Sequence, residues 1–266
     1  MKITEYCKTP FTWGISKLNE KFGKPDIKEL IVLFGYMSAG KTEFAYFVAR
    51  QNIKLDNKVG FISLELDEDS MKLRIARKKA NVSKIQFQDK RYTDVQERMM
   101  QESLDILESQ EWLLLICPEN KDIESIMTSL RELYDEWCRF FIIDNLDKIW
   151  WPNEDNERYK LITWALQDFK NENNICILLL HHAKKPMKSQ EYLPAGMSWL
   201  RWSQKILDNA TQVIEIWRDL DPDKEENKDE VMIYQYKDTF EWANGVDTIY
   251  FHKWDYYDES QQEKPF

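Results

Sequence analysis

A chain of 266 residues with 43% hydrophobic residues can bury one substantial core, so we expect one domain. Its formal net charge of -10 excludes a surface that is basic all over, and any polyanion must therefore bind a local basic patch. The content of 11 Trp, 12 Tyr and 13 Phe excludes a disordered chain. Scattered single cysteines and the lack of a long apolar run favour a soluble cytoplasmic protein, or one of an equivalent intracellular compartment.

Short apolar runs alternate with amphipathic stretches along most of the chain. This order is typical of an α/β fold in which a mostly parallel, twisted sheet is flanked by helices. Apolar residues at helical spacing predict helices over residues 123–137 and 161–169, which should pack on the sheet. The buried strands are predicted at Leu30–Phe34, Val59–Leu64, Trp112–Ile116, Phe140–Ile143 and Ile175–Leu180.

Beyond residue 210 the pattern changes to strand-like runs that surround a charged loop from residue 219 to residue 230. These runs are Gln212–Trp217, Val231–Tyr236 and Thr248–Trp254. We expect them to extend the edge of the sheet as antiparallel strands.

The segment from Gly35 to Thr42 reads GYMSAGKT and fits the phosphate-binding pattern G-x-x-x-x-G-K-[ST]. It lies directly between a predicted strand and an apolar-periodic helix, whereas a chance glycine turn needs neither. Such a loop surrounds phosphate with backbone N–H groups, and the helix N-terminus adds partial positive charge. The residues predicted to bind a nucleoside triphosphate are Gly35, Ser38, Ala39, Gly40, Lys41, Thr42 and Glu43.

Two acidic residues end apolar strands and are candidates for the chemistry of hydrolysis. Asp144 follows Phe140–Ile143 and is predicted to hold Mg²⁺ together with Thr42, although such an acid can also cap a turn. Glu65 should orient or deprotonate the attacking water from the end of a strand beside the phosphate-loop strand. The alternative for Glu65 is an exposed loop acid.

The strand that ends at Leu180 runs into His181 and His182, two of the three histidines in the chain. Adjacent side chains on a strand point to opposite faces, so the pair is poorly suited to bind zinc. His182 is a candidate sensor of the γ-phosphate and so belongs with Lys41 and Glu65 among the catalytic candidates. The alternative is a structural histidine.

Cations and tryptophans gather between residues 184 and 205 of an otherwise acidic chain. Single-stranded nucleic acid is held by charge and by stacking, which these residue types supply. The alternative is a solvated lysine loop with tryptophans in the core. For Trp150 and Trp151 we favour packing. The predicted DNA-binding residues are Lys184, Lys185, Arg201 and Lys205.

The order of these motifs resembles the RecA-like ATPase domain of DnaB-type replicative helicases over nearly the whole chain. Phe61–Glu65 resembles the strand that carries the family's catalytic glutamate, and Asp144-Asn145-Leu146 is similar to its magnesium-binding strand. His182 stands where the family usually has a glutamine sensor, and Val231–Lys237 resembles the strand that delivers a basic finger to the neighbouring subunit. The family normally has arginine where this chain has Lys237, which lacks the planar fork.

The resemblance implies a homo-oligomer, such as a hexameric ring, that hydrolyses ATP with Mg²⁺ at its subunit interfaces and moves along single-stranded DNA in replication. It further implies a single RecA-like domain over residues 1–266, with residues 1–28 leading into a core over 29–266 and no separate N-terminal helical domain. Two alternatives stay open. One is a DNA-stimulated RecA-like ATPase that acts as a recombination or assembly switch without unwinding, and the other is a small-molecule kinase, for which no arginine-rich lid is visible.

Overall fold

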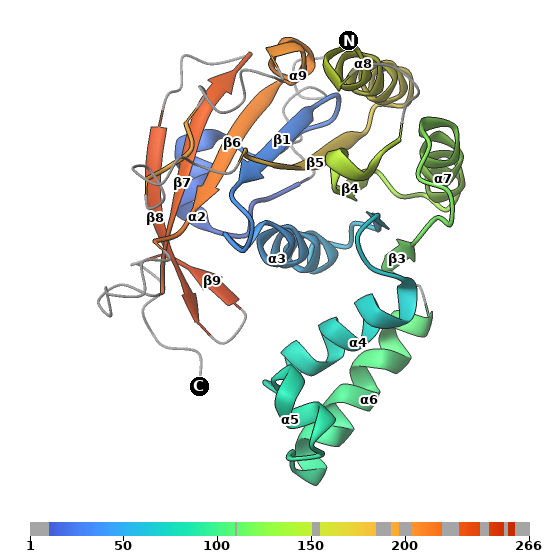
Figure 1. Ribbon diagram of the computed structural model, residues 1–266, viewed down its shortest axis with the longest axis vertical. Helices are drawn as coiled ribbons and strands as arrows, with labels where there is room; N and C mark the ends of the chain where they lie inside the picture. Colours follow the sequence, from blue (N-terminus) through green and yellow to red (C-terminus); the bar gives the residue numbers. More distant parts are fainter. Residues whose placement is uncertain are drawn as a thin grey trace.

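The computed structural model describes residues 11–109, 111–150, 155–184, 193–196, 204–219, 229–239, 245–252 and 255–258. In these ranges a nine-stranded sheet runs in the order β3-β2-β4-β5-β1-β6-β7-β8-β9 (Figure 1). The first six positions pair in parallel, and β7 to β9 add an antiparallel edge. The predicted α/β class is therefore confirmed. The strands are β1 (Leu30–Gly35), β2 (Val59–Ser63), β3 (Leu113–Ile116), β4 (Phe140–Asp144), β5 (Cys176–His182), β6 (Gln212–Trp217), β7 (Glu230–Asp238), β8 (Gly245–His252) and β9 (Asp255–Tyr257).

Helices cover both faces of the sheet, and the alternation of side chains along each strand supplies both cores. On β1, Ile31 and Leu33 join the cluster beneath α3, whereas Leu30, Val32 and Phe34 join the cluster beneath α7 and α8. All five side chains are fully buried, which explains why the strand is apolar without interruption. The helices are α2 (Ser16–Phe22), α3 (Lys41–Ile53), α4 (Glu68–Lys79), α5 (Lys84–Gln88), α6 (Asp94–Ser109), α7 (Ile123–Asp135), the 3-10 turn η1 (Leu146–Lys148), α8 (Asp155–Asn173) and α9 (Gln204–Asn209).

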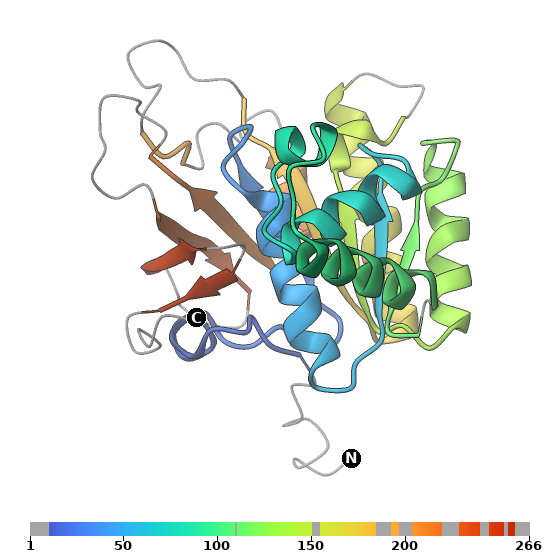
Figure 2. The same cartoon turned by 90° about the horizontal axis from the view of Figure 1, so that it is seen from below.

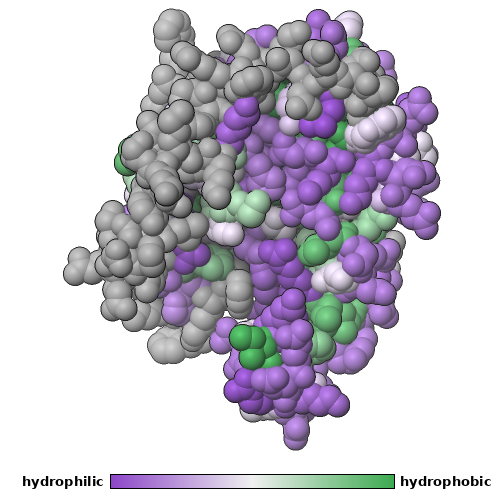
Figure 3. All heavy atoms as spheres, viewed as in Figure 1, coloured by the Kyte–Doolittle hydropathy of each residue, from purple (hydrophilic) through white to green (hydrophobic). Residues whose placement is uncertain are grey.

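The helices α4, α5 and α6 project from the sheet as a unit, and from below they stand in front of α3 (Figures 1 and 2). Ser83 begins α5 with a reciprocal capping box to Gln86. The surface in the view of Figure 3 is mostly hydrophilic over this unit, with small separate hydrophobic patches. A core of its own holds the unit together, formed by Ala76, Ala80, Val82 and Met100.

The segment before β1 is packed into the same core as α3. Trp13 is buried, its indole Nε1–H donates to the Gly23 carbonyl at 2.8 Å, and its ring stacks on Phe44 of α3. Asn52, at the other end of α3, donates to the carbonyl of Thr12 at 2.9 Å. Residues from Phe11 onward are thus integral to the packing of the phosphate-loop helix. No helix of the described ranges is long and apolar enough to cross a membrane.

Several tryptophans differ from the packing predicted for them. Trp137 lies beyond the end of α7 and is 76% exposed, because the chain turns there with a positive φ of 68°. Trp164 and Trp150 are also exposed, at 53% and 61%, and Trp151 lies outside the described residues. On α8 the buried stripe consists of Ile162, Leu166 and Phe169. The predicted last strand, Thr248–Trp254, is shifted: β8 begins earlier, at Gly245, and ends earlier, at His252, where β9 pairs back on it.

Candidate active site

The phosphate loop connects β1 to α3 and has a backbone that requires its glycines. Gly40 is the N-cap of α3 and has a φ of 100°, a left-handed conformation that favours glycine. At Gly35 a methyl group would stand 2.3 Å from the Ile216 carbonyl oxygen of β6. The loop therefore passes close against the sheet and leaves the N-terminus of a 13-residue helix available to an anion.

Lys41 lies in the curve of this loop and is almost fully buried. Its Nζ donates to the carbonyl oxygens of Gly35 at 2.9 Å and Tyr36 at 2.8 Å. Burial lowers the pKa of Lys41 to about 8, although the nearby carboxylates of Asp144 and Glu65 oppose this effect. A phosphate placed here adds negative charge that favours the ammonium form. The site thus fits a polyphosphate.

Thr42 and Asp144 meet at the carboxyl ends of the parallel strands, as the motifs predict. The Thr42 hydroxyl donates to Asp144 Oδ2 at 2.7 Å. Burial raises the pKa of Asp144, and the Thr42 hydrogen bond opposes that rise. A hydroxyl beside a carboxylate is the oxygen set that Mg²⁺ uses when phosphates supply further ligands, so the pair fits the metal. The described residues contain no separate cluster of three or more histidine, cysteine or acidic ligands.

Glu65 lies just beyond the end of β2, against the ends of β4 and β5. Its Oε1 accepts from Asn145 Nδ2 at 2.5 Å and lies 3.1 Å from His182 Nε2, while Asn145 Nδ2 is 2.9 Å from the same ring nitrogen. The hydrogen bond from His182 is the main cause that lowers the pKa of Glu65. The carboxylate is about one-third exposed. An ionised, oriented and reachable acceptor therefore faces the phosphate loop.

The prediction that the strand before Glu65 lies next to the phosphate-loop strand was wrong. We expected Glu65 to end a strand beside β1, but β4 and β5 lie between β1 and β2. Chain order does not fix strand order when crossover connections skip positions in a parallel sheet. Glu65 still reaches the site, because Leu64 N–H donates to the Asp144 carbonyl and draws the end of β2 towards β4.

Glu43 and Lys237 contact other parts of the chain. The Glu43 carboxylate, in the first turn of α3, forms ion pairs with Arg74 and Lys78 of α4. Lys237 Nζ donates to the carbonyls of Leu207 at 2.5 Å and Ala210 at 2.7 Å, at the C-terminal end of α9.

Of the predicted DNA-binding residues, only one side chain is described. Lys184 is exposed directly after β5, next to the sensor strand. Lys185 and Arg201 lie outside the described residues, and Lys205 is described only as part of α9.

Sequence reasoning missed Asn145 and Asp147 as site residues. Asn145 is fully buried and joins Glu65 to His182. Asp147 accepts from the backbone N–H of His182 at 2.9 Å and lies beside His181 on the other face of the strand end. Both follow Asp144 within three positions of the sequence. This closeness to the predicted metal-binding residue was the signal that could have identified them as site residues.

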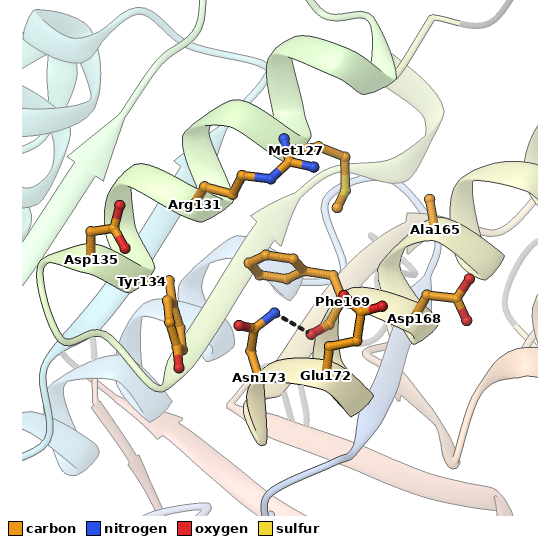
Figure 4. A pocket seen from close by; sticks show the side chains of 9 residues that line it. All are labelled: Met127, Arg131, Tyr134, Asp135, Ala165, Asp168, Phe169, Glu172 and Asn173. Atoms are coloured by element: carbon orange, nitrogen blue, oxygen red, sulfur yellow. Dashed lines mark hydrogen bonds between the residues drawn. The ribbon is translucent and has the colours of Figure 1, made fainter.

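A pocket of about 500 Å³ lies elsewhere, between α7 and α8 (Figure 4). It is lined by the apolar and aromatic side chains of Met127, Tyr134 and Phe169 and by charged side chains such as Asp168 and Glu172. None of its lining residues belongs to the nucleotide site.

Comparison with protein-family models identifies the family that has this site. The model of the DnaB-like helicase C terminal domain family matches residues 11–241. The chain belongs to this family. A search of the curated proteins found no match.

Solved structures agree with this DnaB-like helicase domain in fold. The structure titled "ATPase Domain of G40P" has a TM-score of 0.82 at 15% identity, covering 96% of this chain and 94% of that chain. A DnaB-like replicative helicase, solved in a study of its interactions with primase, has the same TM-score and identity, with 97% of this chain and 64% of that chain covered. The RadB recombinase has a TM-score of 0.61 at 12% identity, covering 93% of this chain and 99% of that chain. The RecA-like fold is common to them.

Proposed function

We propose that this DnaB-like helicase domain is an ATP-dependent DNA helicase or translocase motor. The observation that carries the proposal is the convergence of five groups at the carboxyl ends of β1, β2, β4 and β5. Lys41 and Thr42 come from the phosphate loop, Asp144 from β4, Glu65 from the end of β2 and His182 from β5. Phosphate binding, metal binding and water activation thus have separate groups within one site.

Each group has a physical role in hydrolysis. Lys41 places positive charge at the phosphates, where negative charge grows in the transition state. Glu65 is ionised and accepts a hydrogen bond from the attacking water. Its contacts with His182 and Asn145 keep the carboxylate oriented for this role. Asp144 and Thr42 would hold Mg²⁺, which when bound would supply charge that neutralises the phosphate oxygens.

The motor is proposed to act as a homo-oligomer on single-stranded DNA, with a hexameric ring as the assembly. Family membership supports this, and so does the exposed position of Lys184, a predicted DNA-binding residue that directly follows the sensor strand. Within such an assembly Lys237 serves the ATP of the neighbouring subunit. To do so it must leave the α9 carbonyls that it now contacts.

A second candidate is a recombination or assembly switch that hydrolyses ATP without unwinding. The similarity of fold to the RadB recombinase and the internal hydrogen bonds of Lys237 favour it. Both candidates use the same nucleotide site. They differ in whether hydrolysis is coupled to movement along DNA.

The test is the steady-state ATPase rate with Mg²⁺, measured with and without long single-stranded DNA at two salt concentrations. A motor should be stimulated by DNA, and stimulation should fall with salt because phosphate contacts release counterions. Lys41→Ala should lower the rate by about 100-fold or more. Lys54→Ala, an exposed lysine just beyond the other end of α3, is the matched control and should change nothing.

Near-normal turnover of Lys41→Ala would contradict the assignment of the nucleotide site. An ATPase rate that single-stranded DNA does not change favours the switch. DNA-stimulated hydrolysis is followed by a strand-separation assay, in which a failure to unwind also favours the switch.

A further inference from the structure

The end of β4 carries an acidic residue that the proposed mechanism does not use. Asp147 lies in η1, three residues after Asp144, and its side chain is three-quarters buried. Its Oδ2 accepts from the His182 backbone N–H at 2.9 Å and lies 3.1 Å from His181 Nδ1. Its Oδ1 accepts from the Tyr159 hydroxyl of α8 at 2.8 Å. One carboxylate therefore joins η1, β5 and α8.

This contact fixes the backbone that carries the sensor histidine. The N–H of His182 points to Asp147, and the N–H of the next residue, Ala183, donates to the carbonyl of Gly35 in the phosphate loop at 3.0 Å. The strand end is therefore held from both sides. The His182 ring is thereby presented to Glu65 and Asn145.

The groups that surround the Asp147 side chain favour its ionised form. Burial alone raises the pKa of Asp147, but His181, the His182 N–H and the Tyr159 hydroxyl together hold it well below its usual range. Hydrogen bonds to an ionised acceptor are about twice as strong as neutral ones. Arg158 donates to the Tyr159 hydroxyl at 2.9 Å and packs over its ring, and His181 meets the same ring edge-on.

We propose that Asp147 is a positioning residue that holds His182 against Glu65 and joins this end of β5 to α8 through Tyr159. The proposal rests on the function proposed above, because His182 and Glu65 are assigned there to hydrolysis. A change at the nucleotide site that moves His182 must also move Asp147, and with it the hydroxyl of Tyr159. Helix α8 thus responds to the state of the nucleotide site.

The key variant is Asp147→Asn, which keeps the shape but offers one acceptor oxygen in place of two. Its NH2 group must face either the His182 N–H, which is also a donor, or the Tyr159 hydroxyl, which must then give up its own donated hydrogen bond and accept; in both cases the negative charge that strengthens the bond from the His182 N–H is lost. Misplacement of His182 should lower kcat by about 10- to 100-fold while the KM for MgATP stays within about twofold. Asp168→Asn, an exposed acid on α8, is the matched control (Figure 4).

A spectroscopic readout separates failure of this proposal from failure of the proposed function. The chain has three histidines, so the ring signals of His181, His182 and His252 can be assigned by NMR. Asp147→Asn should shift the His181 and His182 signals and leave His252 in place, whether or not the protein hydrolyses ATP. Unshifted His182 signals, or a normal kcat in a protein that does hydrolyse ATP, would overturn the positioning role.

Tyr159→Phe tests the connection to α8 and leaves Glu65, Asn145 and His182 untouched. In the wild type, binding of a slowly hydrolysed ATP analogue with Mg²⁺ should change amide hydrogen exchange over residues 157–166. The phenylalanine variant should bind the analogue with the same affinity and lose at least half of that change. No change in the wild type, or an equal change in the variant, would overturn the link.

Discussion

Replacing Glu29 by glutamine should stabilise the protein at alkaline pH and have little effect at acid pH. Glu29 precedes β1, at the end opposite the phosphate loop, and is only 4% exposed. Its Oε2 accepts from the Asp26 N–H at 2.9 Å, and its Oε1 lies 3.4 Å from Gln212 Nε2. Burial raises its pKa from 4.5 to about 7, because removal from water disfavours the charged form.

The magnitude and its sign follow from proton linkage. A folded-state pKa above the unfolded value contributes stability that is fully present below about pH 4.5 and is lost as the pH rises through about 7. At 1.36 kcal/mol per pKa unit, the rise from 4.5 to about 7 corresponds to about 3 kcal/mol. The glutamine side chain stays neutral and avoids this loss. Gln212 Oε1 has no hydrogen-bond partner in the described structure, so a reoriented Gln212 amide can accept from the new side chain.

The assay is urea unfolding of the wild type and Glu29→Gln at pH 5 and pH 8.5, with Asp135→Asn as an exposed control. The free energy of unfolding should favour the variant by about 2 to 3 kcal/mol at pH 8.5, and by clearly less at pH 5. An equal difference at both pH values, or a loss of stability at pH 8.5, would refute the reasoning. ATPase activity should not change, because Glu29 is remote from the nucleotide site.

Two further predictions concern the site itself. Glu65→Gln should keep nucleotide affinity and lower turnover by about 100-fold or more, since an amide cannot accept the proton of the attacking water. Fluorescence measures nucleotide binding, and single-turnover experiments measure hydrolysis. A normal rate of hydrolysis would exclude Glu65 from the mechanism. Lys237→Ala, mixed in equal amounts with wild-type protein, should depress the ATPase rate below the proportional average if the lysine acts across an interface; a simply proportional loss contradicts that role.

The sheet and the phosphate site could be predicted because their signals are local. Strands such as Phe140–Ile143 are buried on both faces, so they read as uninterrupted apolar runs. The glycines, the lysine and Thr42 of the phosphate loop lie within eight residues. An acidic residue at the carboxyl end of β4 lies at the same edge of the sheet as the phosphate loop. This explains why the sequence could place Asp144 beside Thr42.

Other features depend on tertiary structure and carry no such signal. Asn145 and Asp147 are ordinary turn residues until β2, β5 and α8 bring Glu65, His182 and Tyr159 to them. The helices of residues 68–109 were not predicted: this charged stretch builds only a small core, although its longest helix, α6, is clearly amphipathic. An apolar stripe on a helix also fails to show which of its flanks a neighbour will cover, which is why Trp164 was assigned to the core.

The projecting unit of α4, α5 and α6 has a consequence for folding cooperativity. Its own buried cluster consists of four small or medium side chains with Phe87, Tyr92 and Leu104 packed against them, and only Met71, Ile75 and Leu107 of the unit join the main core, so it gains far less from burial than the sheet does. Local opening of such a unit requires less free energy than global unfolding. Arg74 and Lys78 of α4 are the ion partners of Glu43, the residue after Thr42. Each opening that unwinds α4 therefore removes two positive charges from beside the phosphate loop while the sheet stays folded.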